Sequence, residues 1–550
     1  MDYYRGEPLH NLGDLPSMGA ARYEDKAAFV FHGQELSFAG LEAESNQIAN
    51  VLTENGVEPG DRVGIFIPNT LEFPPAYFGI VKAGAVAVPL NLRMDPETLA
   101  YVIQDAGADH LIGSAFLSEE VQGLAQAAEV GTLYLPGVSE EGIVNLSHAK
   151  MEATDEFERV DREFDDIACQ PYTSGTTGKP KGVLLSHRNL LSTIESYDSG
   201  GLALDPDDSI LLVLPLFHIY ALNAIMGSYL LTGASMVLQA QPEAVPMLEA
   251  IDEYEITKFA GVPAMYTMMF REYRNNPDDY DLSSLKDVTC AAAPLADAPR
   301  RSIEEACNVP MVEGWGMTET SPAGCVEPVR GVRKSAGCIG PPVPNIELKL
   351  VNPQTRETIV PAEALEPRGM ANPDLDFDDK EAVTGEIAVR GRQVFEGYYN
   401  LPDKTEAVFD DDGWFYTSDI ARVDSDGYFW MVDRADDMMI VGGENVYPAE
   451  VEDALYAHPD VAEAAVAAAP HEVKGQAPVA FVVLEEGASV TEEELRKYTL
   501  EHVATYAHPR RIFFVDELPR SATQKVQRFK LEQDAEERLG GPLTSTEEEL

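Results

Sequence analysis

The sequence predicts a large α/β domain, in which helices cover parallel sheets and a strand-rich subdomain follows, and then a smaller α+β domain. The chain has 550 residues, more than one hydrophobic core usually supports. Apolar, β-rich runs alternate with helical patterns up to about residue 330, which is typical of parallel sheets covered by helices. Beyond 352–381 the pattern becomes rich in strands. We therefore expect domains at 1–435 and 436–537, and an acidic, disordered tail at 538–550.

A series of short apolar runs predicts the strands of the parallel sheets. Each run is followed by a polar or glycine-rich segment. Open α/β sheets bind their ligands at the carboxyl ends of the strands, so these segments are the candidates for a binding site. The runs are RVGIFIP (62–68), AVAVPLN (85–91), DHLIGS (109–114), SILLVLP (209–215), ITKFAGV (256–262) and VTCAAAP (288–294).

The segment 209–242 contains no Asp, Glu, Lys or Arg, and it is long enough to span a bilayer. Pro215, His218 and Asn223 interrupt it, and the residues that precede it are Asp rather than the basic residues typical of a membrane flank. We interpret the segment as a buried strand–helix–strand unit, and we predict no transmembrane segment.

The C-terminal third of the chain changes character twice. The stretch 352–381 is rich in Pro and acidic residues, which predicts a solvated surface insertion with no catalytic part. The polar segment 435–437 then precedes a mixed pattern, and the domain boundary is placed there. The predicted elements are strands at 385–391 and 427–434, helices near Glu450 and Glu492, and a strand at 479–486.

The charge balance is strongly acidic, with 40 Lys and Arg against 94 Asp and Glu and a formal net charge of −54. Such a chain is not expected to bind nucleic acid or an anionic membrane surface. The acidic residues are spread along the whole length, which favours adaptation to concentrated salt, where the Debye length falls to roughly 3 Å. The alternative is a merely acidic protein from a dilute environment.

The cysteines predict a reducing compartment. There are five of them, with no CxxC spacing, so neither a disulfide framework nor a zinc site is indicated. The N-terminal segment lacks the basic and apolar regions of a signal peptide. We expect a cytoplasmic protein.

The run TSGTTGKPKGVLLSHRN (173–189) admits three interpretations: a linker, a Walker loop, or a phosphate loop of another kind. A Walker loop places four residues between its first Gly and its Gly-Lys pair. Only two residues separate Gly175 from Gly178, and Pro180 follows Lys179. An apolar segment at 166–172 and a candidate N-cap at Ser186 predict strand, loop and helix, a context in which backbone N–H groups bind anions. A phosphate loop of another kind is therefore favoured.

Other unusual stretches follow predicted strands or the domain boundary, and together with this run they carry a resemblance. The chain resembles the adenylate-forming superfamily of acyl-CoA synthetases, adenylation domains and luciferases from about residue 20 to 535. The segment GGENVYPAEVE makes it most similar to the acyl- and aryl-CoA ligase branch. The stretches are PLFHIYALN (215–223), GVPAMY (261–266), CAAAPL (290–295), EGWGMTETS (313–321), FYTSDIA (415–421), VDRADDMMIVGGENVYPAEVE (432–452) and LPRSATQKVQRFKL (518–531).

The resemblance implies that the glycine-rich run binds the β- and γ-phosphates of ATP. Glycines allow close backbone approach, hydroxyls donate hydrogen bonds, and lysines supply charge. The residues implied are Thr173, Ser174, Gly175, Thr176, Thr177, Gly178, Lys179 and Lys181.

The resemblance also assigns the rest of the nucleotide site. Gly314, Trp315 and Gly316 bind adenine, Thr318 contacts the α-phosphate, and Glu319 holds Mg²⁺. The family more often has Tyr at the position of Trp315. Asp419 and Arg434 are implied to contact the ribose hydroxyls, and Ser418 stands where the family usually has Gly.

The resemblance further implies a catalytic lysine and a moving C-terminal domain. Lys525 is the implied adenylation lysine, because a cation that bridges the attacking carboxylate and the α-phosphate stabilises the transition state. Gln524 replaces a usual Gly beside it. Gly443 is implied to let the pantetheine arm of CoA pass, and Asp436, two positions after Arg434, is the implied hinge. The implied acyl pocket consists of His218, Gly261, Val262, Ala291, Ala292 and Met317.

The expected function is an AMP-forming acid–CoA ligase that uses ATP, Mg²⁺ and CoA. The apolar, Met-containing segments of the acyl pocket suit a neutral acid, and a medium- or long-chain fatty acid best. Alternatives are an aryl-acid CoA ligase, a stand-alone adenylation enzyme that loads a carrier protein, a luciferase-like oxygenase, and a non-catalytic nucleotide-binding protein. A homo-oligomer is compatible with the sequence.

Overall fold

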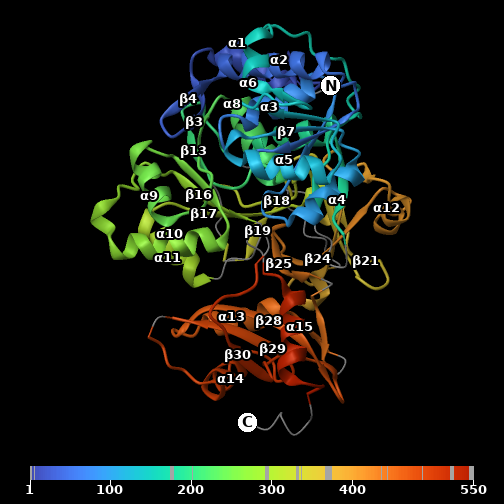
Figure 1. The fold of residues 1–550 in the computed structure, drawn as a ribbon. Helices are drawn as coiled ribbons and strands as arrows, with labels where there is room; N and C mark the ends of the chain where they lie inside the picture. Colours follow the sequence, from blue (N-terminus) through green and yellow to red (C-terminus); the bar gives the residue numbers. More distant parts are fainter. Residues whose placement is uncertain are drawn as a thin grey trace.

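The computed structural model describes residues 3–543 except for short internal segments. Those segments are 5–6, 174–178, 201, 292–296, 330–333, 336, 366–374, 435–436, 442–443, 486 and 521–525. The chain forms a large N-terminal domain and a smaller C-terminal domain, which lies below the rest of the molecule in Figure 1 (orange to red). The predicted fold class is confirmed.

The first sheet is parallel at its centre and antiparallel at one edge. β6, β5, β7, β8 and β9 pair in parallel, whereas β12 runs antiparallel to its neighbours β10, β11 and β23. In spatial order the strands are β11 (Tyr172–Thr173), β12 (Lys181–Ser186), β10 (Ile167–Cys169), β6 (Val86–Pro89), β5 (Arg62–Phe66), β7 (His110–Gly113), β8 (Thr132–Leu135) and β9 (Ile143–Asn145), and β23 (Gly397–Tyr398) also pairs with β12.

The second sheet is parallel except for its two edge strands, β18 and β4. Both sheets contain the predicted apolar runs, because strands buried on two faces need nearly continuous apolar sequence. In spatial order the strands are β18 (Cys325–Val326), β17 (Met311–Trp315), β16 (Asp287–Ala291), β15 (Lys258–Gly261), β13 (Ser209–Leu212), β14 (Ser235–Leu238), β3 (Ala27–Phe31) and β4 (Gln34–Ser37).

Helices cover these sheets, and Figure 1 shows α9, α10 and α11 together beside β16 and β17. Local signals set their ends. The side chain of Asp95 accepts a hydrogen bond from the Thr98 N–H at the start of α4, and Gly107 ends that helix in the left-handed conformation. The helices are α1 (Asp14–Tyr23), α2 (Phe38–Glu54), α3 (Phe73–Lys82), α4 (Pro96–Ala106), α5 (Ser118–Ala127), α6 (Leu146–Glu152), α7 (His187–Gly200), α8 (Ser228–Thr232), α9 (Ala244–Glu253), α10 (Pro263–Asn275), α11 (Asp297–Cys307) and α12 (Pro402–Val408).

The uncharged segment 209–242 is a buried strand–helix–strand unit, as predicted. Strand β13 leads into a π-helix at Tyr220–Gly227, which continues as α8 and returns through β14. Nearly all of its side chains are buried in the core between the sheets. In the described part of the chain, no helix is both long enough and apolar enough to cross a membrane.

A third, antiparallel sheet forms the strand-rich subdomain. The predicted surface insertion differs from expectation, because its residues Thr358–Val360 form β21, which pairs with β20 and buries Val360. Residues 366–374 of the insertion lie outside the described residues. In spatial order the strands are β19 (Cys338–Gly340), β25 (Phe429–Arg434), β24 (Phe415–Val423), β22 (Thr384–Gly391), β20 (Ile346–Val351) and β21.

The C-terminal domain has its own hydrophobic core, built from residues at and beyond Met439. The predicted tail at 538–550 starts too early. Leu543 is buried, its N–H donates to the Pro470 carbonyl, and the Glu472 N–H donates to the Leu543 carbonyl. The elements are β26 (Met439–Val441), β27 (Glu444–Val446), α13 (Pro448–Tyr456), β28 (Val461–His471), β29 (Gly475–Leu484), α14 (Glu492–Leu500), β30 (Arg511–Phe514) and α15 (Arg528–Leu539).

Candidate active site

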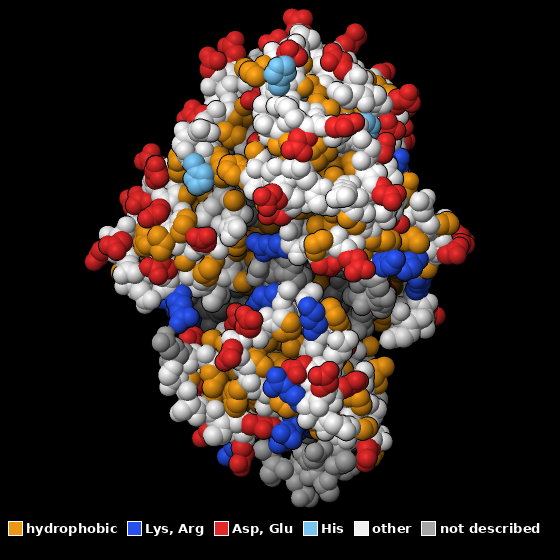
Figure 2. Space-filling model, viewed as in Figure 1, with side chains coloured by type: hydrophobic (Ala, Val, Ile, Leu, Met, Phe, Trp, Pro, Cys, Tyr) orange, Lys and Arg blue, Asp and Glu red, His pale blue; other side chains and the backbone are white. Residues whose placement is uncertain are grey.

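A cavity of about 730 Å³ lies where the sheets of the large domain meet the C-terminal domain. On the face shown in Figure 2, most Lys and Arg side chains lie near this junction or on the C-terminal domain, whereas Asp and Glu crowd the outer surface of the large domain. The cavity is therefore the place where a chain of net charge −54 can receive an anionic ligand. Predicted site residues that line it are Thr173, Lys181, His218, Ala291, Gly314, Trp315, Gly316, Met317, Thr318 and Glu319.

The glycine-rich run connects two strands rather than a strand and a helix, which corrects the predicted context. Tyr172 pairs with Gly182, and Thr173 pairs with Lys181, in the antiparallel ladder of β11 and β12. The apolar alternation after Lys181 builds a buried strand before α7 begins. The Ser186 hydroxyl accepts a hydrogen bond from the Asn189 N–H at 3.2 Å, so its predicted capping role is confirmed. Ser174, Gly175, Thr176, Thr177 and Gly178 lie outside the described residues.

The two lysines of this run have different surroundings. Lys179 is exposed, and its Nζ lies 4.4 Å from the centre of the Tyr101 ring. Lys181 lines the cavity, and its Nζ lies 4.2 Å from the centre of the Tyr398 ring. Cation–π contacts of this kind hold a lysine without neutralising its charge. Lys181 is therefore the better placed of the two to meet an anion in the cavity.

Glu319 is buried at the cavity wall and is oriented by a tyrosine that sequence reasoning missed. The Tyr398 hydroxyl donates a hydrogen bond to Glu319 Oε1 at 2.9 Å, and the Phe395 N–H donates to the Glu319 carbonyl at 2.8 Å. Mg²⁺ usually takes one or two carboxylates together with substrate phosphates. Among the described residues no group of three or more His, Cys, Asp or Glu could form a metal cage. Glu319 is thus a single buried carboxylate at the cavity wall, which is the kind of ligand that such a cation uses.

Trp315 and Asp419 form a buried pair. The indole Nε1–H donates a hydrogen bond to Asp419 Oδ2 at 2.7 Å, although Asp419 does not itself line the cavity. Asp419 on β24 stands opposite Arg434 on β25, whose side chain lies outside the described residues. Ser418 has a φ of 61°, which explains why the family favours Gly at this position. The Ser418 N–H donates to Glu386 Oε1 at 2.8 Å.

The segment around Trp315 is held by close packing and a buried ionic cluster. A Cβ on Gly316 would lie 1.7 Å from the Pro322 carbonyl oxygen, so this position requires glycine. Arg300 on α11 donates to Glu313 at 2.7 Å and to Glu327 at 2.9 Å. Burial raises the pKa of Glu313 to about 8. These contacts fix the end of β17 from which the predicted adenine segment extends.

We expect Trp315→Phe to raise the KM for ATP about tenfold, because the substitution keeps an aromatic ring but removes a hydrogen bond to a carboxylate. The measurement is ATP–pyrophosphate exchange at varied ATP concentration. Trp430→Phe is the matched control, since its indole donates to Ser335 Oγ and it does not line the cavity. An unchanged KM for ATP in Trp315→Phe would show that the indole–carboxylate hydrogen bond does not contribute to nucleotide binding.

We call the part of the cavity that is lined by His218, Tyr197, Leu202, Tyr220, Ala224 and Thr289 the acyl arm; Thr289 belongs to β16 of the second sheet. His218 is half-buried, and its Nδ1 accepts a hydrogen bond from the Tyr220 N–H at 3.3 Å. The predicted pocket residues Gly261 and Val262 are buried and do not line this cavity, and Ala292 lies outside the described residues. Residues of the arm that sequence reasoning missed are Tyr197, Leu202, Tyr220, Ala224 and Thr289.

The C-terminal domain closes one side of the cavity. Arg520, Gln527 and Lys530 line it, and the first two flank the predicted catalytic segment. Lys525, Gly443 and Asp436 themselves lie outside the described residues. The signal that could have revealed Tyr398 is the sequence GYYN at 397–400, whereas no local signal marks the residues of the acyl arm, because they lie on separate strands and helices.

The family described as AMP-binding enzyme matches residues 18–399, and the family described as AMP-binding enzyme C-terminal domain matches residues 450–525. A long-chain-fatty-acid–CoA ligase of Bacillus subtilis (strain 168) is 31% identical over an alignment of 557 positions. The alignment covers 95% of this chain and 94% of that protein. The 4-coumarate–CoA ligase 5 of Oryza sativa subsp. japonica is 34% identical over 538 residues, which cover 95% of this chain and 94% of the relative.

Solved structures agree over nearly the whole chain. The ATP-bound MatB of Rhodopseudomonas palustris has a TM-score of 0.83 at 30% identity, covering 95% of this chain and 99% of its own. The anthranilate CoA ligase AuaEII, in complex with anthranoyl-AMP, has a TM-score of 0.86 at 28% identity, covering 97% and 99%. The protein described above therefore belongs to the AMP-binding enzyme family, within the acyl- and aryl-CoA ligase branch of the adenylate-forming superfamily.

Proposed function

We propose that this enzyme is an AMP-forming acid–CoA ligase. A carboxylic acid attacks the α-phosphorus of ATP to give an acyl-adenylate and pyrophosphate, and the thiol of CoA then displaces AMP. The observation that carries the proposal is one continuous cavity that joins Trp315, Thr318 and Glu319, the candidate nucleotide residues, to an apolar arm beyond His218. A nucleotide and an acid can therefore meet in a single enclosed site.

The residues of the chain divide the work of the first half-reaction. Lys181 and the glycine-rich run bind the outer phosphates in this proposal. Asp419 is assigned to the ribose hydroxyls, although in this structure it accepts the hydrogen bond of the Trp315 indole and does not line the cavity. Glu319 would hold Mg²⁺, which neutralises phosphate charge when it is bound. Lys525 stabilises the negative charge that develops between the attacking carboxylate and the α-phosphate. Enclosure by the two domains strengthens each of these interactions by excluding water.

The acid in this proposal is a neutral carboxylic acid with an apolar body. Among the described residues, the arm is lined by Tyr197, Leu202, Tyr220 and Ala224, which offer an apolar and aromatic surface. This lining supports the predicted fatty acid as the substrate class, and it does not by itself set the chain length. The tyrosines and Ala224 equally favour a flat aryl acid, which is the second candidate.

The test is the release of AMP from ATP in the presence of each of a panel of alkyl and aryl acids, with and without CoA. We expect an acid-dependent and strongly CoA-dependent release. Release that depends on the acid but not on CoA would point to an adenylation enzyme with another acceptor. No release with any acid of the panel would refute the proposal.

We further propose that the acidic surface is an adaptation to concentrated salt. With a net charge of −54, mutual repulsion in dilute buffer opposes the compact state, and molar salt screens it. We expect loss of activity and of cooperative thermal unfolding in dilute buffer, and recovery of both in molar KCl. Sucrose of equal osmolarity is the control. Full activity and unchanged thermal stability in dilute buffer would contradict the adaptation.

A further inference from the structure

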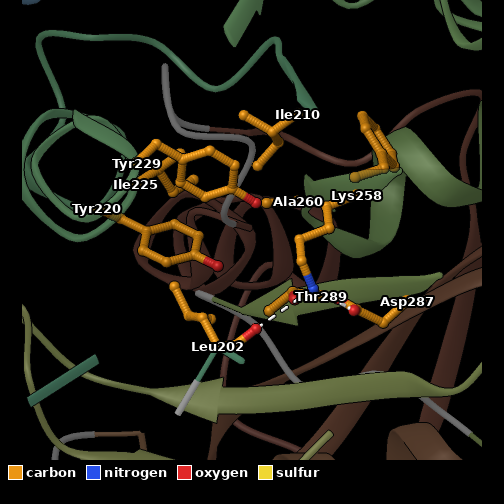
Figure 3. Close-up of a pocket in the computed structure, with 10 residues that line it drawn as sticks. Leu202, Ile210, Tyr220, Ile225, Tyr229, Lys258, Ala260, Asp287 and Thr289 are labelled. Carbon is orange, nitrogen blue, oxygen red and sulfur yellow. Dashed lines mark hydrogen bonds and ion pairs between the residues drawn. The ribbon is translucent and has the colours of Figure 1, made fainter. Parts of the chain in front are cut away.

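A small void lies directly behind the end of the acyl arm. Its volume is about 10 Å³, which is room for about one water molecule. Leu202, Tyr220 and Thr289 line both the void and the large cavity, so a single layer of side chains separates the two. Figure 3 shows the small void with Tyr220 and Leu202 on one side of it and Lys258 and Asp287 of the second sheet on the other.

The far side of the void is closed by a buried ion pair. Lys258 on β15 and Asp287 on β16 stand opposite each other in the parallel ladder, and 5% and 4% of their surfaces are exposed. The Lys258 ammonium donates hydrogen bonds to Asp287 Oδ2 and, at 3.3 Å, to the Leu202 carbonyl. Both bonds are drawn in Figure 3. The pair is therefore tied to Leu202, which lines both the void and the large cavity.

An ion pair at this place is poorly explained by stability. Inner strands of a parallel sheet are usually apolar on both faces, and removing two charges from water costs more than a well-packed apolar pair would. Burial raises the pKa of the Asp287 carboxyl even with the lysine beside it. What the pair adds is a rigid, polar boundary that an apolar chain cannot enter without stripping charged groups of their partners.

We propose that the Lys258–Asp287 ion pair is the specificity-determining end wall of the acyl pocket, which admits aryl acids and alkyl acids of limited length and rejects long alkyl tails. The inference rests on the proposed acid–CoA ligase activity. A tail that filled the arm would next meet Leu202, Tyr220 and Thr289, and behind them a void too small for further methylenes. Each methylene that fits in front of these side chains strengthens binding, and a methylene that must pass them weakens binding.

The test is kcat/KM for CoA-dependent AMP release with straight-chain acids from hexanoate to hexadecanoate. In the unmodified enzyme, kcat/KM is expected to rise roughly fourfold per added methylene, because burial of one methylene stabilises the bound state by about 0.8 kcal/mol. It is then expected to fall at least about tenfold between its maximum and hexadecanoate. The double variant Lys258→Ala/Asp287→Ala removes both charges and opens the wall, so its maximum is expected at an acid longer by two or more methylenes.

The matched control is Lys82→Ala/Glu42→Ala, which removes another ion pair, made by a buried lysine and a partly buried glutamate, that lines neither cavity. Its chain-length profile is expected to stay as in the unmodified enzyme. If the alanine double variant does not fold, Lys258→Met/Asp287→Leu keeps the volume in apolar form. Its ratio of kcat/KM for hexadecanoate to that for hexanoate is expected to rise about tenfold, because a flexible methionine can be displaced.

Two outcomes would overturn the end wall while leaving the ligase activity intact. One is an unmodified enzyme that uses hexadecanoate as well as its best shorter acid. The other is a folded, active wall variant whose profile matches that of the control. Absence of CoA-dependent AMP release with every acid, in the unmodified enzyme, would instead refute the proposed function and is distinguishable from both.

Discussion

Lys525→Ala is expected to lower the rate of acyl-adenylate formation by about two to three orders of magnitude, because one preorganised charge at a developing anion contributes about 3–4 kcal/mol. The attack of a carboxylate on the α-phosphate brings two anions together, so a cation is needed between them. Among the described lysines, Lys181 and Lys530 line the cavity, and of these Lys530 comes from the C-terminal domain. Thioester formation from pre-made acyl-adenylate is expected to be largely spared.

The measurement is ATP–pyrophosphate exchange, with thioester formation from synthetic acyl-adenylate followed separately. Lys497→Ala is the matched control, since Lys497 is an exposed lysine on α14 of the same domain and does not line the cavity. Exchange that survives in Lys525→Ala at more than a tenth of its normal rate would show that another group performs this role.

Asp436→Pro is expected to separate the two half-reactions. In the mechanism that we propose, adenylation needs Lys525 at the phosphates, whereas thioester formation needs the segment around Gly443 there to admit CoA. Both segments belong to the C-terminal domain, so we propose that the domain rotates as a body about a short boundary. Proline fixes φ near −65° and removes an N–H donor, and it therefore holds the boundary in one conformation. With the domain in the adenylating orientation, acyl-adenylate still forms, and we expect CoA thioester production to fall by about two orders of magnitude.

Asp411→Pro is the control for the hinge variant. Asp411 is exposed and is the second residue of a turn, in which the Gly413 N–H donates a hydrogen bond to the Asp410 carbonyl. Proline is readily accommodated at this position of a turn. Adenylate formation is measured by ATP–pyrophosphate exchange, and the thioester by its absorbance. Equal impairment of both half-reactions in Asp436→Pro would indicate misfolding instead, and impairment of neither would place the hinge elsewhere.

Much of the fold and of the nucleotide site follows from local sequence. Apolar runs such as 62–68 and 209–215 contain the strands predicted from them, because strands buried on both faces need continuous apolar residues. The motif around Trp315 and Glu319 lies at the carboxyl end of a parallel strand, as motif position implies. Predictions based on adjacent sequence failed where a segment pairs with a strand that is distant in the chain. The glycine-rich run joins a hairpin because Lys181–Ser186 pairs with β10, β11 and β23 before α7 can start.

The sequence by itself determined the family and the order of its two parts, and it proposed the residues for the nucleotide, since each of these is carried by short, contiguous patterns. Only the tertiary structure decided which side chains act on those residues. Tyr398 orients Glu319 from 79 positions away, and Asp419 meets Trp315 from 104 positions away. The end of the acyl arm likewise depends on Lys258 and Asp287, which are paired by strand register. Such contacts are set by how strands and helices pack. A local motif such as GYYN can mark Tyr398, but it does not tell which residue Tyr398 contacts.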